Sequence, residues 1–273
     1  MLLKSITILS MILAVLECLG NVWMIPLAFV GNFLGLAVLA FLFLVAVSYM
    51  VDQNKEQEND DPFYRWVIAV YVEVLIQLLQ ARVTATGLEK TPKEGRFLLV
   101  CNHQFLADPG ILLHHFRDSQ LAFISKQENR DMFCVGPLMH KILCQTLDRD
   151  NDRQALKVIL KCIQIIKEDK ASIAVFPEGG TNHDNHLYPF RPGAFKIAEK
   201  CKVPIVVCTL RNTPTVFHNM AHLKPCDVDL HLLTVIQPEE YEGISTVELA
   251  NRIHDIMAED IGYDGVFHGT ENT

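Results

Sequence analysis

The sequence lacks the excess of basic residues that a general nucleic-acid-binding protein needs. Its 273 residues include 24 Lys and Arg against 32 Asp and Glu, so the formal net charge is −8. A nucleic-acid backbone demands a basic protein face, and this charge balance therefore argues against nucleic acid as a partner. An anionic ligand would require a local basic site. The chain also contains no internal repeat and no low-complexity tract.

Paired cysteine motifs are absent as well. None of the eight cysteines forms a CxxC pair, and several lie in apolar runs that are typical of buried strands or helices. Structural disulfides belong to oxidising compartments, and zinc sites need closely spaced ligands. The pattern indicates a reducing compartment and cysteines that pack in the core.

Charge is nearly absent from the first 51 residues. From Met1 to Val51 the only formally charged side chains are Lys4 and Glu17. This run is far longer than the apolar core of a secretory signal peptide, which has about 7 to 15 residues. We therefore predict an uncleaved membrane segment over residues 1–51.

The length of this apolar run allows two membrane spans. A span takes about 20 apolar residues, so Leu2–Val51 has room for two helices with a break around Asn21–Asn32, where Pro26 and Gly31 suit a break. A shallow hairpin that enters one leaflet is the alternative, because Glu17 lies near the middle of the run. Two crossings would leave both ends on the same side of the membrane, which we expect to be the cytoplasmic side.

Residues 52–83 are predicted to form a charged linker followed by an interfacial helix. The linker covers Asp52–Asp61, and Phe63–Val83 is apolar with Trp and Tyr interspersed. Trp and Tyr prefer the membrane interface, so this helix could lie on the bilayer surface. It could equally pack on the domain that follows.

Residues 84–273 have the pattern of an α/β domain, in which short apolar runs alternate with longer amphipathic segments. Runs such as FLLVC and IAVF are apolar throughout, which indicates a mostly parallel sheet covered by helices on both faces. Ligands bind beyond the carboxyl ends of strands in such sheets. The predicted strands are 97–101, 121–124, 145–147, 172–176, 205–210 and 229–235, and the predicted helices are 109–116, 130–143, 152–168, 194–200 and 246–260.

His103 and Asp108 follow the first predicted strand of this domain, in the segment NHQFLADP. Five residues of unbroken helix turn through about 500°, which would place the two side chains on different faces. Pro109 favours a loop that ends at Asp108, with Asp108 as the cap of the next helix. In such a loop the carboxylate can hold the imidazole as a general base. An H-x4-D pattern alone also fits a packed loop histidine beside a helix-capping aspartate.

Three further blocks lie near strand ends, and two of them place polar groups there. Phe176-Pro177-Glu178-Gly179-Gly180 follows an apolar strand and contains a tight turn, Leu147-Asp148-Arg149 follows a short strand, and Val203–Val206 leads into another. With NHQFLAD, these blocks occur in the order and approximate spacing of the lysophosphatidic acid acyltransferase family. Over about residues 84–240 the chain resembles the bacterial 1-acyl-sn-glycerol-3-phosphate acyltransferases, and its apolar N-terminus resembles their membrane anchor.

The resemblance implies a role for each block. His103 would be the general base on the acceptor hydroxyl, with Asp108 as its orienting partner. Arg149 would contact the acceptor phosphate, for which a guanidinium provides a bidentate match, although it could instead pair with a nearby aspartate on the surface. Glu178 and Gly179 match the acceptor-binding block.

The chain departs from the family pattern after Glu178 and Gly179. The family usually continues with Thr and Arg, whereas here Gly180 intervenes and Thr181 and Asn182 follow. Arg191, or Lys196, resembles a basic residue that family members carry somewhat later and could compensate. The substrate-binding residues expected from the resemblance are therefore Arg149, Glu178, Gly179, Gly180 and Arg191.

Metal binding is not expected. His183, Asp184 and His186 form a small cluster, but their spacing matches no zinc pattern, and an exposed loop explains them. We expect no metal and no cofactor.

The resemblance implies an enzyme that moves a fatty acyl group from acyl carrier protein or acyl-CoA to the sn-2 hydroxyl of 1-acyl-glycerol 3-phosphate, making phosphatidic acid. Acylation of another lysolipid, and a thioesterase or lipid hydrolase that uses the same dyad, are the alternatives. The expected partners are the acyl donor, a lysophospholipid acceptor and the lipid bilayer. The expected location is the inner membrane of a bacterial cell, with the catalytic domain on the cytoplasmic side.

Overall fold

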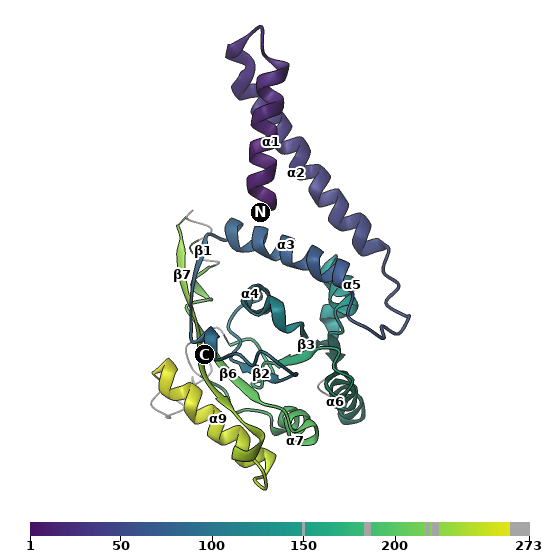
Figure 1. Cartoon of the computed structure of the whole chain (residues 1–273), viewed down its shortest axis with the longest axis vertical. Coiled ribbons are helices and arrows are strands. Elements are labelled where there is room, and N and C mark those ends of the chain that lie inside the picture. Colours follow the sequence, from purple (N-terminus) through teal and green to yellow (C-terminus); the bar gives the residue numbers. More distant parts are fainter. Residues whose placement is uncertain (149–150, 183–186, 217–218, 220–223, 263–273) are drawn as a thin grey trace, which may run out of the picture.

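The protein consists of a projecting helical hairpin and an α/β body, joined by a linker and a helix that lies across the body (Figure 1). The structure is a computed structural model, and it describes residues 1–148, 151–182, 187–216, 219 and 224–262. The hairpin points away from the sheet, so its tip is the part most distant from the body.

The hairpin is formed by α1 (Leu2–Glu17) and α2 (Ile25–Tyr49), which pack against each other. The break between them begins at Cys18 and includes a short 3-10 turn over Val22–Met24, somewhat earlier than predicted. Pro26 lies in the first turn of α2, where its missing N–H leaves no helical hydrogen bond unmade. Gly31 lies inside α2, so its predicted place in the break was wrong.

Helix α3 (Pro62–Leu78) begins at a cap supplied by Asp61, whose carboxylate accepts hydrogen bonds from the backbone N–H groups of Phe63 and Tyr64 at 3.1 and 3.4 Å. The helix ends earlier than the predicted Val83. Residues Ala81–Thr86 form strand β1 instead, so the sheet begins three residues before the predicted boundary at 84. Three of the six residues in ARVTAT, Val83, Thr84 and Thr86, are β-branched, which suits a strand better than a helix.

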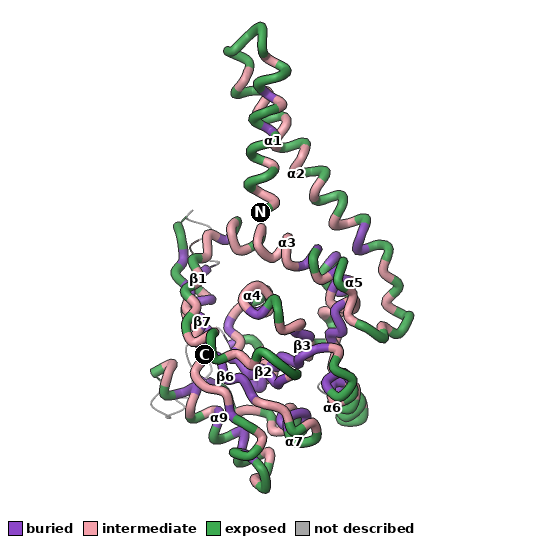
Figure 2. Tube along the Cα trace, in the orientation of Figure 1, coloured by how far each residue is buried: buried purple, intermediate pink, exposed green. Residues whose placement is uncertain are grey.

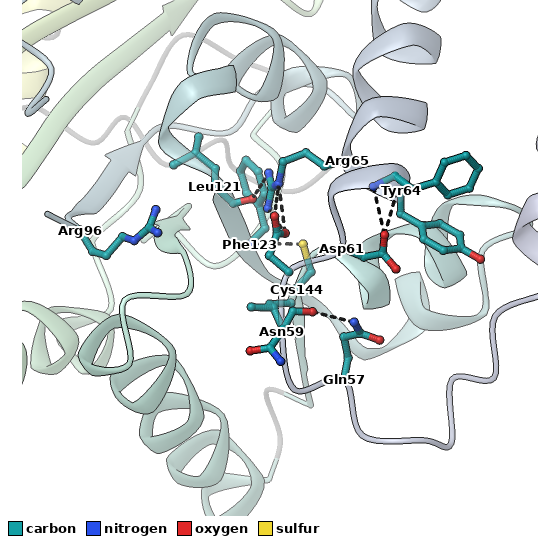
Figure 3. Close-up of polar contacts among 12 residues, drawn as sticks. Gln57, Asn59, Asp61, Tyr64, Arg65, Arg96, Leu121, Phe123 and Cys144 are labelled. Atoms are coloured by element: carbon teal, nitrogen blue, oxygen red, sulfur yellow. Dashed lines mark hydrogen bonds and ion pairs between the residues drawn. The ribbon is translucent and has the colours of Figure 1, made fainter. Parts of the chain in front are cut away.

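Arg65 of α3 forms a buried ion pair with the linker and a hydrogen bond to the body (Figure 3). The Arg65 guanidinium binds the Asp60 carboxylate, with Nε at 2.8 Å from Oδ2, and its Nη1 donates to the carbonyl oxygen of Leu121 at 3.1 Å. The side chains of Arg65 and Asp60 are only 16% and 7% exposed. On the other side of α3, the hydroxyls of Tyr64 and Tyr71 donate to backbone carbonyls of α2. Helix α3 thus connects the hairpin with the start of strand β3.

We predict that Arg65→Ala lowers the free energy of unfolding by about 3 kcal/mol, because it leaves the Asp60 carboxylate buried without its counter-charge. Thermal or denaturant unfolding of the purified protein in detergent would measure this loss. Arg117→Ala is the matched control, since the exposed Arg117 side chain donates to the carbonyl oxygen of His114 and forms no ion pair within the described part of the chain. Its unfolding should shift by less than about 0.5 kcal/mol. Equal stabilities of the two variants would contradict the anchoring role.

The body is built on a seven-stranded sheet in the order β1-β7-β6-β2-β5-β3-β4. Strands β2, β3, β4, β5 and β6 run parallel, whereas β7 is antiparallel to β6, and β1 pairs parallel with β7. The predicted mostly parallel sheet is therefore confirmed. The bounds not yet given are β2 Leu98–Cys101, β3 Leu121–Lys126, β4 Gln145–Leu147, β5 Ser172–Val175, β6 Ile205–Arg211 and β7 Cys226–Ile236.

Helices cover both faces of the sheet. Helix α4 (Asp108–His115) and α5 (Val135–Lys141) lie with α3 on one face, and α6 (Asp152–Lys167), α7 (Lys196–Cys201) and α9 (Thr246–Ile261) lie on the other (Figure 1). Every residue of β2 and β5 is buried, as the apolar runs predicted. Figure 2 shows this burial concentrated in the centre of the body, while the hairpin is mostly exposed.

Two predicted helices are shorter than expected. The segment 130–143 begins with a 3-10 turn, Gln127–Asp131, and becomes α-helical only at Val135. The segment 194–200 likewise begins as a 3-10 turn, Pro192–Phe195, and is α-helical only from Lys196. The predicted strands and the remaining body helices match within a few residues.

Candidate active site

The loop after β2 is anchored to the neighbouring strand by Asn102. Its side-chain amide donates to the carbonyl oxygen of Leu210 at 2.8 Å and accepts from the Leu210 N–H at 2.7 Å. Asn102 is 1% exposed, so this pair of hydrogen bonds is shielded from water. It continues the β2–β6 ladder through a side chain and fixes the point at which the loop carrying His103 begins.

His103 and Asp108 are in direct contact, as predicted. The imidazole Nδ1 lies 3.0 Å from Oδ2 of Asp108, which also accepts from the backbone N–H groups of Gln104 and Phe105 at 2.7 and 2.8 Å. Asp108 is fully buried, whereas the His103 side chain is 16% exposed. A carboxylate that accepts all three hydrogen bonds requires the proton on Nδ1, and this tautomer leaves Nε2 as the basic nitrogen.

The route by which the chain achieves this contact differs from the prediction. Asp108 does not cap α4; it is the first residue of that helix, and Ala107 is its N-cap. The Asp108 N–H donates to the carbonyl oxygen of Phe105 at 3.0 Å, which closes a tight turn. The carboxylate therefore points backward to the N–H groups of the preceding loop rather than forward to those of its own helix.

An aromatic stack holds the plane of the imidazole. The His103 ring lies 4.2 Å from the Phe176 ring at an interplanar angle of 21°, and Phe123 stacks on Phe176 at 5.8 Å. Phe176 directly follows β5, and Phe123 lies in β3. With one nitrogen bound to Asp108 and one face covered by Phe176, the ring has a single favourable orientation.

Glu178 ties the β5 loop to the His103 backbone. Its Oε1 accepts from the His103 N–H at 3.1 Å, and its Oε2 accepts from the Tyr188 N–H at 3.0 Å and the Asn182 side chain at 3.5 Å. The Asn182 N–H returns a bond to the His103 carbonyl oxygen at 2.7 Å. Burial raises the pKa of Glu178, against the opposing effect of these hydrogen bonds. Its predicted contact with the acceptor stays a prediction.

Gly179 and Arg191 are neighbours beside this loop. The Arg191 N–H donates to the carbonyl oxygen of Pro177 at 2.9 Å. Gly179 has φ +76°, and a Cβ built there would lie 2.5 Å from Nε of Arg191. The Arg191 guanidinium thus passes over a residue without a side chain, in the loop whose Glu178 bonds to the His103 backbone.

Comparison with known proteins assigns the chain to a family. The family model described as Acyltransferase matches residues 82–211, the range that contains β2, the dyad and the β5 loop. Residues 82–211 form an acyltransferase domain. This confirms the resemblance stated above and makes the protein an O-acyltransferase.

Two relatives cover most of this acyltransferase. The probable 1-acyl-sn-glycerol-3-phosphate acyltransferase of Mycoplasma pneumoniae is 28% identical over 229 residues, which span 78% of this chain and 85% of the relative. The 1-acyl-sn-glycerol-3-phosphate acyltransferase of Saccharomyces cerevisiae is 26% identical over 214 residues, which span 76% and 70%.

A solved structure has a similar fold. The crystal structure of the 1-acyl-sn-glycerophosphate (LPA) acyltransferase PlsC from Thermotoga maritima matches with a TM-score of 0.61, covering 81% of this chain and 86% of that one at 22% identity. The likeness supports the arrangement of sheet and helices described above.

Four residues singled out in the sequence lie outside the described residues: Arg149, expected at the acceptor phosphate, and the cluster His183, Asp184 and His186. Within the described part of the chain, no group of three or more His, Cys, Asp and Glu side chains could hold a metal ion. Gly180 lies beside Gly179, and a Cβ built on it would meet no atom within 4 Å.

Sequence reasoning missed three residues that shape the site: Asn102, Phe176 and Asn182. A polar residue directly after a fully apolar strand, as Asn102 is after LLVC, is a usable signal for a buried anchor. Nothing in the sequence indicated that Asn182 would bond to the histidine backbone, because that contact joins two loops distant in the chain.

We predict that Gly179→Ala lowers stability by about 1 to 2 kcal/mol, because its positive φ disfavours any side chain and the new methyl group would displace Arg191. Gly180→Ala is the matched control, with open space around its Cβ, and should change stability by less than about 0.5 kcal/mol. Thermal unfolding of both variants tests this difference. Identical melting temperatures would show that the loop accommodates a side chain at residue 179.

Proposed function

We propose that this acyltransferase transfers a fatty acyl group from an acyl thioester to the sn-2 hydroxyl of 1-acyl-sn-glycerol 3-phosphate, forming phosphatidic acid. The observation that carries the proposal is the contact of 3.0 Å between His103 Nδ1 and Asp108 Oδ2. It occurs in a chain whose relatives are named for this acceptor.

The reaction follows from the tautomer that Asp108 fixes. Nε2 of His103 takes the proton from the acceptor hydroxyl, and the alkoxide oxygen attacks the thioester carbonyl carbon. The C–S bond then breaks, and the departing thiolate takes the proton back from Nε2. Asp108 stabilises the imidazolium between these steps. Neither a cofactor nor a covalent enzyme intermediate is needed.

Arg191 and Arg149 are proposed to bind the acceptor phosphate. Within the described residues, no carboxylate pairs with the exposed Arg191 side chain, which leaves its guanidinium available for an anion. Glu178 is proposed to act by positioning, since its carboxylate accepts hydrogen bonds from both loops. The glycines beside it would let the phosphate approach the backbone.

The hairpin of α1 and α2 is proposed to enter the lipid bilayer. Its surface is mainly large apolar side chains, including Trp23 at the tip, which is 89% exposed. Among the described helices, Val22–Tyr49 has the length and composition needed to cross a membrane, although α1, with 16 residues, is shorter than the span of about 20. Both ends of the hairpin lie beside α3 (Figure 1). We therefore place the body on one side of the membrane, which we propose to be the cytoplasmic side.

Acyl transfer in detergent or vesicles tests the proposal directly. Labelled acyl-CoA and acyl carrier protein donors would be offered with lysophosphatidic acid, another lysophospholipid, glycerol 3-phosphate or no acceptor. We expect phosphatidic acid from lysophosphatidic acid. Product only from another acceptor would reassign the headgroup, and label released only as free fatty acid would make the protein a hydrolase.

We further predict that Arg191→Ala raises the KM for lysophosphatidic acid about tenfold and changes kcat little, because a phosphate contact acts on the bound ground state and transition state alike. With monoacylglycerol, which has no phosphate, the variant should match the unmodified protein. Arg252→Ala is the control, since Arg252 pairs with Glu240 on the outer surface. An equal effect of Arg191→Ala on both acceptors would rule out a phosphate contact.

A further inference from the structure

A cleft of about 350 Å³ lies along the outer edge of the sheet. The linker residues 53–57 form one wall, and α5, β4 and α6 form the others. Strand β4 is the last strand of the sheet, so one of its edges faces this cleft rather than another strand. The cleft is separate from the loops that carry His103 and Glu178.

The lining of the cleft is basic in a protein of net charge −8. Arg130, Lys157 and Lys161 line it, against one carboxylate, Glu56. Lys161 pairs with Glu56. Among the described residues, Arg130 donates to two neutral oxygens, the carbonyl of Gln53 at 3.1 Å and the side chain of Asn54 at 3.2 Å.

Two positive charges in this cleft therefore lack a counter-charge. Arg130 is one, and Lys157, which forms no ion pair within the described part of the chain, is the other. Uncompensated cations in a concave site attract an anion, since the recess reduces the competing solvation. Phosphate suits them, because a lysine provides a point charge and an arginine a planar fork.

The position of the cleft determines which substrate's phosphate can bind in it. The carboxyl ends of β2 and β4 lie at the same edge of the sheet, with β5 and β3 between them. At about 4.8 Å per strand, the cleft is roughly 15 Å from His103. In the acceptor only a few bonds separate the phosphate from the reacting hydroxyl, so that phosphate cannot reach the cleft while the hydroxyl is at Nε2. An acyl thioester on phosphopantetheine carries its phosphate at the far end of a long arm.

We infer that the cleft between residues 53–57, β4 and α6 binds the phosphate of the phosphopantetheine arm of the acyl donor. The inference rests on the proposed function, because it assumes that His103 acts at the thioester end of that arm. Acyl-CoA and acyl carrier protein share this phosphate.

Shortened donors test the inference. Transfer rates would be measured with S-acyl-4′-phosphopantetheine and with S-acyl-pantetheine, which lacks the phosphate. We expect Lys157→Ala to raise the KM for the phosphorylated donor about five- to tenfold with an unchanged kcat, and to leave the KM for S-acyl-pantetheine unchanged. Lys167→Ala is the matched control, because Lys167 is exposed at the far end of α6 and does not line the cleft.

A second variant should act in the opposite direction. Glu56→Gln frees Lys161 from its carboxylate partner and should lower the KM for the phosphorylated donor about twofold, an effect that weakens as salt is added. The same variants assayed with acyl-CoA and with acyl carrier protein would show which full donor uses the cleft.

The outcomes separate this inference from the proposed function. The cleft assignment alone would be overturned if transfer is normal but its KM is the same for donors with and without the phosphate. It would also be overturned if Lys157→Ala raises the KM equally for both shortened donors. Absence of transfer from every donor to every acceptor would overturn the proposed function, and the cleft assignment with it.

Discussion

Replacing His103 with alanine should lower kcat for acyl transfer at least about 10³-fold and leave the protein folded. The imidazole is the group proposed to take the proton from the acceptor hydroxyl, and a positioned general base contributes about 10²- to 10⁴-fold. A further loss of kcat is expected because the negative charge of the buried Asp108 would no longer have an imidazolium to stabilise during the reaction. Initial rates at saturating donor and acceptor, with circular dichroism and thermal unfolding, measure both quantities.

A second histidine provides the control for this experiment. His254→Ala removes an imidazole from α9, on the opposite face of the sheet from α4, and should retain full activity. Activity of His103→Ala within tenfold of the unmodified protein would remove His103 from the mechanism. A simultaneous loss of fold would instead mean that its stack on Phe176 is structural.

Replacing Asp108 with asparagine should lower kcat about 10²- to 10⁴-fold, with a small loss of stability. The side-chain amide oxygen can occupy the position of Oδ2 and accept the same three hydrogen bonds, so the geometry survives while the negative charge disappears. The amide nitrogen then takes the position of Oδ1, which is buried and has no hydrogen-bond partner among the described residues. An unpaired buried donor costs about 1 to 3 kcal/mol.

Asp108→Ala distinguishes the two roles of this carboxylate. It leaves three donors without an acceptor, those of His103, Gln104 and Phe105, so it should lower the free energy of unfolding by about 3 kcal/mol or more. The asparagine variant should therefore be nearly as inactive but clearly more stable. If both variants are equally unstable, Asp108 acts mainly on the loop and its proposed electrostatic role in transfer is not supported.

The body of the fold was predictable because its strands are apolar along their entire length. LLVC and SIAV carry no alternation, and only a strand covered on both faces has that pattern. Strand β1 was missed because ARVTAT is half exposed rather than apolar throughout, and it follows α3 almost directly. Its place in the sheet depends on pairing with β7, which begins at residue 226, and no local pattern contains that information.

The predicted contact between His103 and Asp108 is confirmed, but the reason given for it was partly wrong. Pro109 indicated a helix start, and a helix start near Asp108 is present, but the carboxylate bonds to the N–H groups of the preceding loop instead of capping the helix. The turn from Phe105 to Asp108 decides this, and its geometry cannot be derived from residue types. The contact distance between His103 and Asp108 therefore came only with the structure.

The division into membrane helices, linker with interfacial helix and catalytic domain stays a prediction. Helix α3 fits both predictions made for its segment, packing on the body and lying at the membrane interface. Tyr64 and Val67 are buried toward the protein, whereas Trp66 is 56% exposed. A helix with one face on the body and a tryptophan outside could also touch a lipid surface.

The bonds that Glu178 and Asn182 make to the backbone of His103 limit how this enzyme could be redesigned. A chimera that receives a new headgroup specificity by grafting the segment after β5 from a relative would also exchange residue 178, whose side chain accepts from the N–H of the general base. The Asn182 bond is donated by its backbone N–H, which every residue except proline retains. Grafts that keep Glu178 and place no proline at residue 182 should remain active. Grafts that replace Glu178 should lose turnover before they change preference, so screening for altered specificity would return mostly inactive proteins.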